Sequence, residues 1–270
     1  MSSVKTPLGI LAGSGDLPLI VAETARKQSI PVVSVCFDQE TYNNIQKVSD
    51  STAIYRLGQA GKSIKFLKDA GVERVVLIGK IAKKVVFRDL MFDATGLKIM
   101  ARAIVKSDSA IMISIIEELE LAGLVVEKQT DWIGDVMPSE GVIGKVKPSK
   151  RGLEDMKFGM KLCSYLAGED VGQTMIVKEG VIVAVEAVEG TDEAIERGCR
   201  LAGKGAVMVK MSRPNQDLRF DIPAIGAGTV EQLKNHKAEG IGFEAGGVVI
   251  VNMNETIAAA DAAGIALVAL

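Results

Sequence analysis

A chain of 270 residues with 48% hydrophobic composition can bury a sizeable core, and its length favours two ordinary domains over one large one. Its 32 Lys and Arg residues nearly balance its 34 Asp and Glu residues, so it has no overall positive field to hold nucleic acid. Seven Phe, three Tyr and one Trp are also few for a base-stacking surface, and we therefore expect no nucleic-acid partner.

The spacing of the cysteines and the pattern of the first residues indicate in which cellular compartment the protein is expected. Cys36, Cys163 and Cys199 lie far apart without a CxxC pair, and His236 is the only histidine, which disfavours both a disulfide framework and a zinc site. The first residues lack the pattern of a signal peptide, and no stretch reaches the roughly 18 uncharged apolar residues of a spanning helix. The sequence predicts a protein of the reducing cytoplasm.

From Leu8 to about Asp135, short aliphatic runs alternate with amphipathic stretches, which predicts βα units around a parallel sheet. Strands are expected at 8–12, 31–37, 53–56 and 74–78. Helices are expected at 17–28, with Asp16 as N-cap and Pro18 in the first turn, and at 62–70, ended by Gly71.

The first strand runs into a glycine-rich turn, Gly13-Ser14-Gly15-Asp16, and then a helix. Glycines allow backbone N–H groups to approach a phosphate, and a helix start favours negative charge. Pro18 stands where a G-x-G-x-x-G fingerprint has its third glycine, and Asp16 would repel phosphate unless a metal intervened. A plain tight turn is the alternative interpretation.

Two more strand ends carry glycine and lysine. Gly58-Gln59-Ala60-Gly61-Lys62 opens a helix, but Arg56 replaces the first glycine of a P-loop, which disfavours an ATP or GTP motor. Gly79-Lys80 follows the strand at 74–78. Together these turns predict a ligand crevice at the carboxyl edge of the sheet, and ordinary turns with solvated lysines are the alternative.

Beyond residue 81 the chain is expected to be helical and rich in Met, at 90–104 and 109–122. Its basic residues, which lie among apolar ones, are Lys83, Lys84, Arg88, Lys98, Arg102 and Lys106. Such a surface can take alkyl chains and lipid head groups, although core packing with solvated edges is the alternative. A Pro- and Gly-rich stretch at 138–152 then places a domain boundary near Pro138.

The second half predicts an α/β domain with mixed strand directions. A hairpin is expected from 174–177 and 181–188 around Lys178-Glu179-Gly180. Further strands are expected at 206–210, 242–243, 248–251 and 265–268, alternating with helices at 192–201, 229–238 and 255–263.

Two segments of this half carry candidate chemistry. Glu186, Glu189 and Asp192 gather where a strand meets a helix and suit a hard cation, although Thr191 or Asp192 serving only as a helix N-cap is the alternative. The stretch from Lys210 to Pro223 displays Lys, Arg and Asp in a segment that two prolines stiffen. It fits phosphoryl chemistry, with Asp217 or Asp221 holding Mg²⁺ or orienting water, and a solvated loop is the alternative.

Several long strings in this order resemble the LpxI family. They are LGILAGSGDLP, GQAGK, IGK, DVGQ, VEAVEGTD and KMSRPNQDLRFDIPAIG, and the likeness continues to the tail ETIAAADAAGIALVA. The resemblance implies a Rossmann-like amino-terminal domain, at 1–137, and a catalytic α/β domain with a mixed sheet, at 138–270. It also implies Mg²⁺-dependent hydrolysis of UDP-2,3-diacylglucosamine to UMP and lipid X in lipid A synthesis, with water attacking the β-phosphorus. A homodimer and, at most, transient peripheral contact with the inner membrane are expected.

On that likeness Asp221 matches the essential acid, supported by Asp217 and Lys210, and Asp221 and Asp192 are the expected metal ligands for Mg²⁺ or another divalent cation. The expected substrate-binding residues are Ala12, Gly13, Gly15, Asp16, Gly58, Gln59, Lys62, Gly79, Lys80, Gly172, Gln173, Glu186, Glu189, Gly190, Thr191 and Asp192. Two other functions stay open at this point: another sugar-nucleotide enzyme such as a transferase, and a non-catalytic module that binds UDP-sugar.

Overall fold

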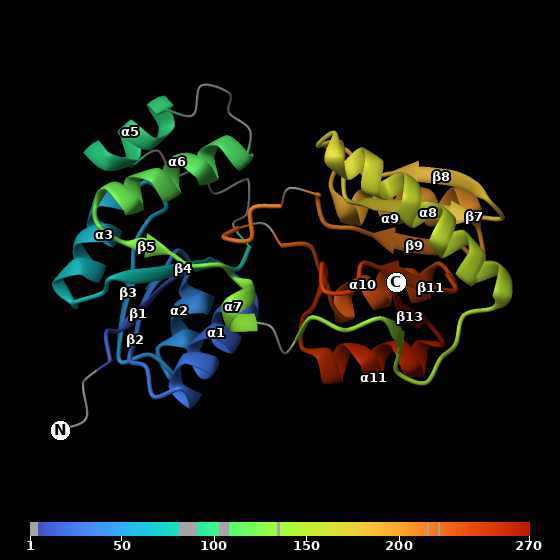
Figure 1. Cartoon of the computed structure of the whole chain (residues 1–270), viewed down its shortest axis with the longest axis horizontal. Coiled ribbons are helices and arrows are strands. Elements are labelled where there is room, and N and C mark those ends of the chain that lie inside the picture. Colours follow the sequence, from blue (N-terminus) through green and yellow to red (C-terminus); the bar gives the residue numbers. More distant parts are fainter. Residues whose placement is uncertain (1–4, 81–90, 103–107, 134–135, 215, 221) are drawn as a thin grey trace. The chain divides into compact units, whose positions relative to one another are not determined.

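The computed structural model of the chain describes residues 5–80, 91–102, 108–133, 136–214, 216–220 and 222–270. The chain folds into two compact units (Figure 1). Unit 1 comprises Met1–Ile133 together with Leu218–Phe220, and unit 2 comprises most of the chain beyond residue 133. Both units are α/β, as the sequence predicts.

Unit 1 is built on a parallel sheet of five strands in the order β3-β2-β1-β4-β5. The strands are β1 (Leu8–Ala12), β2 (Val32–Cys36), β3 (Ser51–Ile54), β4 (Arg74–Ile78) and β5 (Val125–Val126). β3 begins two residues earlier than expected, and the short β5 is not predicted from the sequence. The chain moves outward from β1 to β3 and then returns to β4 on the other side, so the switch point lies between β1 and β4.

Helices cover both faces of this sheet. In Figure 1, α1 (Leu17–Lys27), α2 (Gln39–Ile45) and α7 (Thr130–Ile133) lie on one face, and α3 (Ala60–Asp69), α5 (Ala94–Arg102) and α6 (Asp108–Leu121) lie on the other. The second layer packs because α3 and α6 present Leu67 and Ile116 to the alternate strand residues Leu11, Val33 and Val35. This packing fixes the carboxyl ends of β1 and β4.

Two expectations for unit 1 change in detail. Asp16 stands at the N-cap position of α1, but its side chain makes no capping hydrogen bond because the residue adopts a helical backbone conformation, φ −89° and ψ −19°. The expected helix at 90–104 is seen as α5 over 94–102. Of the basic residues in the expected lipid-contacting stretch, Lys98 and Arg102 lie in α5, where Arg102 pairs with Glu118 at 2.7 Å, and the other four lie outside the described residues.

Unit 2 is built on a mixed sheet of six strands in the order β6-β13-β11-β9-β7-β8. The strands are β6 (Gly141–Ile143), β7 (Thr174–Lys178), β8 (Val181–Val185), β9 (Val207–Lys210), β11 (Gly240–Phe243) and β13 (Ala266–Ala269). β9, β11 and β13 are parallel, whereas the other three run antiparallel to their neighbours. Two short strands, β10 (Ala224–Ile225) and β12 (Val249–Ile250), pair separately.

The sheet of unit 2 also lies between two helical layers. The long helix α8 (Lys150–Gly168) packs Met156, Met160 and Cys163 against alternate residues of the strands, including Val207 and Val209. The opposite face, with Met208 at its centre, packs against α9 (Thr191–Ala202), α10 (Ala227–Asn235) and α11 (Met253–Ala263). The sequence analysis does not identify α8, although it is the longest helix that the structure describes.

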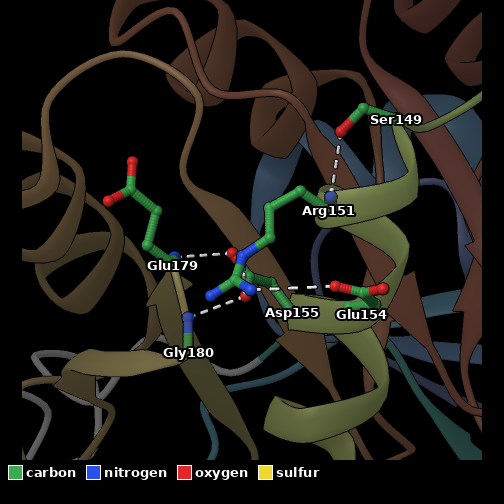
Figure 2. Close-up of polar contacts among 7 residues, drawn as sticks. Ser149, Arg151, Glu154, Asp155, Glu179 and Gly180 are labelled. Atoms are coloured by element: carbon green, nitrogen blue, oxygen red, sulfur yellow. Dashed lines mark hydrogen bonds and ion pairs between the residues drawn. The ribbon is translucent and has the colours of Figure 1, made fainter.

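A buried carboxylate fixes the turn between β7 and β8. Glu179 and Gly180 both have positive φ, 50° and 74°, which is the conformation of the tight hairpin turns that match strand twist. Asp155 of α8 is 4% exposed and accepts hydrogen bonds from the backbone N–H groups of both residues, at 2.6 and 2.8 Å. Figure 2 shows these bonds and the guanidinium of Arg151, whose Nε lies 3.4 Å from Asp155 Oδ1.

Replacing Asp155 with alanine is expected to lower the free energy of unfolding by about 2 kcal/mol, because two turn N–H groups lose a buried acceptor. Urea denaturation of the wild type, Asp155→Ala and Asp155→Asn measures the effect. The asparagine variant keeps one acceptor oxygen and should lose less. An alanine variant with wild-type stability would show that the turn holds without this carboxylate.

Candidate functional site

At the switch point of unit 1, two predicted glycines bring strand ends into backbone contact. A Cβ atom at Gly13 would lie 2.6 Å from the carbonyl oxygen of Lys80, and one at Gly79 would lie 2.6 Å from the carbonyl oxygen of Gly13. The next residues, Ser14 and Lys80, exchange two backbone hydrogen bonds of 2.8 Å. Close backbone approach therefore accounts for Gly13 and Gly79, and Ala12 lies buried at the end of β1.

A small cavity of about 80 Å³ lies beside this backbone bridge. Its lining includes Ser14, Gly15 and Asp16 from the first turn, and Glu40, Thr41 and Asn44 from α2. A Cβ atom at Gly15 would meet nothing within 4 Å, so the turn is open on that side. With two carboxylates in its wall, the cavity suits hydroxyl or amine donors better than a bare phosphate.

The predicted phosphate turn at the start of α3 is occupied by a side chain of unit 1 itself. Asp93 Oδ2 accepts the backbone N–H of Lys62 at 3.1 Å, and Asp93 Oδ1 accepts that of Gly96 at 2.8 Å. Gln59 Oε1 caps the turn by accepting the N–H of Arg56 at 3.1 Å. A Cβ atom at Gly58 would lie 2.8 Å from the carbonyl oxygen of Met91, so close backbone packing accounts for a glycine at this position.

In unit 2, residues from three separate sequence motifs come together at one edge of the sheet. Lys210 ends β9 and pairs with Thr174, the first residue of β7, while Glu186 directly follows β8. Lys210 is 7% exposed, and its Nζ donates to Thr191 Oγ1 at 3.3 Å and to Thr174 Oγ1 at 3.5 Å. Thr191 Oγ1 in turn donates to Glu186 Oε1 at 2.8 Å.

The lysine side of this cluster is buried, whereas Glu186 and Thr191 are partly exposed. Cys163, which is 1% exposed, has its thiol pKa raised to about 12, first by burial and then by the negative charge of Glu186, while Lys210 opposes the rise. The second carboxylate oxygen of Glu186, Oε2, is buried and has no hydrogen-bond partner within the part of the chain that the structure describes. A charged group of a ligand entering here would meet strong, weakly screened fields.

Gly172 and Gln173 support this edge. A Cβ atom at Gly172 would collide with the backbone carbonyl of Glu186, so only glycine lets the two segments approach. Gln173 accepts the backbone N–H of Met211 at 2.9 Å through its carbonyl, and its side-chain amide donates to Gln216 Oε1 at 3.2 Å. Both residues therefore hold the loop that follows Lys210.

Glu244, which was not among the residues predicted from the sequence, anchors the same loop. Glu244 Oε2 accepts the backbone N–H of Ser212 at 2.8 Å and also its hydroxyl. Its position in the sequence could have identified it. Glu244 comes directly after the buried strand β11, which is parallel to β9, so its side chain emerges at the same edge of the sheet as the loop after Lys210.

Glu189, Gly190 and Asp192 belong to the same turn as Glu186 and Thr191. Glu189 pairs with Arg197 at 2.6 Å, and its pKa is lowered first by its own backbone N–H and then by that guanidinium. Gly190, with φ of 85°, begins α9 as its N-cap, and Asp192 is exposed in the first helical turn. The N-cap interpretation of Thr191 is wrong, because Gly190 takes that position.

The loop after β9 reaches unit 1 before Asp221. Leu218–Phe220 belongs to unit 1, where the carbonyl of Leu218 accepts the backbone N–H of Gln129 at 2.8 Å and Phe220 is buried among the residues of its core. Arg219 pairs with Glu120 at 2.9 Å. Asp217 is half-buried, and Asp221 lies outside the described residues.

The chemistry of the donor set decides whether a divalent cation fits. Over residues 5–80, 91–102, 108–133, 136–214, 216–220 and 222–270, no group of three or more His, Cys, Asp and Glu side chains is arranged to hold a metal. The exposed carboxylate of Asp192 is a hard oxygen donor, and Mg²⁺ commonly binds through one or two carboxylates plus substrate phosphates. Among the two expected ligands, Asp192 is thus of the donor type that Mg²⁺ prefers, and Asp221 lies outside the described residues. Among the described helices, none has the length and apolar character needed to cross a bilayer.

Comparison with known families covers nearly the whole chain. Residues 7–136 match the LpxI N-terminal domain, and residues 139–268 match the LpxI C-terminal domain. A relative from Caulobacter vibrioides, named UDP-2,3-diacylglucosamine pyrophosphatase LpxI, is 30% identical over 269 residues, which span 96% of this chain and 95% of the relative.

Solved structures give weaker similarities. The ADP complex of an N5-carboxyaminoimidazole ribonucleotide synthetase is 11% identical, with a TM-score of 0.29, over 75% of this chain and 46% of that one. The biotin carboxylase subunit of a pyruvate carboxylase is 12% identical, with a TM-score of 0.28, over 73% of this chain and 41% of that one. Neither likeness supports an inference about this chain.

Proposed function

Because the chain belongs to the LpxI family, we propose that it hydrolyses the pyrophosphate bond of UDP-2,3-diacylglucosamine, releasing UMP and lipid X for lipid A synthesis. The observation that carries the proposal is the 30% identity to a pyrophosphatase of that name over 96% of the chain. The buried lysine cluster of unit 2 supports it, because a dry cationic group at a sheet edge suits a phosphate ligand.

A pyrophosphate resists attack chiefly through its negative charge, so catalysis requires charge neutralisation and alignment of water. We assign Lys210 to the phosphate oxygens, Asp221 to orientation of the attacking water, and Asp217 to support of that acid. Asp221 and Asp192 would hold Mg²⁺, which when bound neutralises charge on the phosphates. Water attacking the β-phosphorus leaves UMP as the departing group.

Unit 1 contributes recognition in this proposal. Gly15 and Asp16 line the cavity beside the first turn, and its carboxylates suit the hydroxyl groups of a ribose or sugar. Gly58, Gln59 and Lys62 act indirectly, because Asp93 and the turn itself satisfy the start of α3. Magnesium dependence, a homodimer and peripheral contact with the inner membrane stay predictions.

Incubation of the purified chain with UDP-2,3-diacylglucosamine, with Mg²⁺ or with EDTA, tests the proposal. We expect UMP and lipid X in equal amounts when Mg²⁺ is present, without any added acceptor, and neither product with EDTA. A transferase would require an acceptor, and a binding module would bind the substrate without releasing UMP. Either result would refute the hydrolase assignment.

A further inference from the structure

The hydrogen bonds through Thr191 have a fixed polarity. Its hydroxyl carries one proton, and an ionised carboxylate is an acceptor only, so the Thr191 proton points to Glu186 Oε1 at 2.8 Å. The lone pairs of the same oxygen then accept from Lys210 Nζ at 3.3 Å. The Oγ1 atom of Thr191 therefore lies between the carboxylate of Glu186 and the ammonium group of Lys210, and is hydrogen-bonded to both.

The three residues come from elements that the fold holds in place. Lys210 is the last residue of β9, Glu186 follows β8, and Thr191 is the first residue of α9. The close packing of Gly172 on the carbonyl of Glu186 leaves little room for the backbone of Glu186 to shift. Side-chain rotation is consequently the available route by which the lysine and the glutamate could move together.

Charge favours such a rotation. Both charged groups act on the buried thiol of Cys163, and Lys210 is 7% exposed while Glu186 is partly exposed, so the field between them is screened less than at the open surface. In that environment an ammonium and a carboxylate attract strongly, and a lysine side chain has many accessible rotamers. A direct ion pair would draw the ammonium toward Glu186.

We propose that Thr191 is a positioning residue that separates Lys210 from Glu186 and so limits the pull of this glutamate on the Lys210 ammonium, which we assign to the phosphate oxygens of the substrate. This role rests on the proposed function, because it requires Lys210 to act on a phosphate. Glu186 has two effects: it orients the threonine hydroxyl, and it competes for the ammonium when that hydroxyl is absent.

Steady-state UMP release by Thr191→Val, Thr191→Ser, Glu186→Gln and the Thr191→Val/Glu186→Gln double variant tests the proposal. Loss of the hydroxyl should lower kcat about 30-fold and change KM less than about threefold, because the lysine acts on charge that develops during reaction. The serine variant, which retains the hydroxyl, should stay within about threefold of the wild type in kcat. The double variant should be no slower than Thr191→Val, because glutamine no longer attracts the ammonium.

Thr256→Val is the control, since Thr256 is a buried threonine of the same unit that donates its hydroxyl to the carbonyl of Val251 at 2.6 Å. It should lose thermal stability and keep its kcat. Equal losses of kcat in Thr191→Val and Thr191→Ser, or losses that multiply in the double variant, would overturn the positioning role. A wild-type protein that releases no UMP would instead overturn the proposed function.

Discussion

Replacing Asp221 with alanine is expected to lower kcat for UMP release by about 10³-fold or more, because the attacking water loses the carboxylate that orients it. Substrate binding should persist, since this variant removes one side chain and leaves Lys210 and the cavity of unit 1 in place. Rates measured at saturating substrate, together with the shift of the unfolding temperature by substrate, separate the two effects.

The control for this variant is Asp69→Ala. Asp69 is an exposed acid that pairs with Lys65 at 2.7 Å in α3, and such surface pairs contribute little. It should keep the wild-type rate. Normal turnover by Asp221→Ala would remove Asp221 from the mechanism and leave Asp217 as the acid to test.

Replacing Lys210 with methionine is expected to lower kcat/KM by about 10²- to 10³-fold, because one cation directed at the phosphates is lost from a dry site. Methionine approximates the volume of the lysine stem, so packing against Thr174 should change little. Lys210→Arg keeps the charge, but its wider planar head replaces a compact ammonium that lies 3.5 and 3.3 Å from the hydroxyls of Thr174 and Thr191.

The arginine variant should therefore recover only part of the activity that methionine loses. Circular dichroism and thermal unfolding establish that each variant is folded before its rate is compared. A folded Lys210→Met variant with wild-type kcat/KM would contradict the assignment of Lys210 to the phosphates.

The strands were the more predictable part of the fold. Buried aliphatic runs bounded by Gly and Pro identify β1, β2, β4 and β9 to within one or two residues, because a parallel strand is apolar on both faces. The helix α8 was missed because its first turn, Lys150-Arg151-Gly152, lies in a Gly- and Pro-rich stretch that indicates a boundary. β6 was missed for the same reason, since Gly141 begins it.

The site was predicted as separate motifs, and their grouping required the structure. The sequence places Glu186 and Thr191 in one segment and Lys210 in another, whereas the contact between the two segments depends on the antiparallel pairing of β7 with both β8 and β9. The role of Gly172 could not be derived either, because a glycine that permits backbone packing and one that approaches a phosphate look alike in sequence. Asp93 was overlooked because its bond to Lys62 joins residues 31 positions apart.

Hydrolysis in water enriched in ¹⁸O tests the central claim most directly, because the label marks the phosphorus that water attacks. With UDP-2,3-diacylglucosamine and Mg²⁺, we expect the heavy oxygen in the phosphate of lipid X and none in UMP, as determined by mass spectrometry of both products. Label in UMP would place the attack on the α-phosphorus, and the absence of both products would contradict the assignment of this chain as a pyrophosphatase.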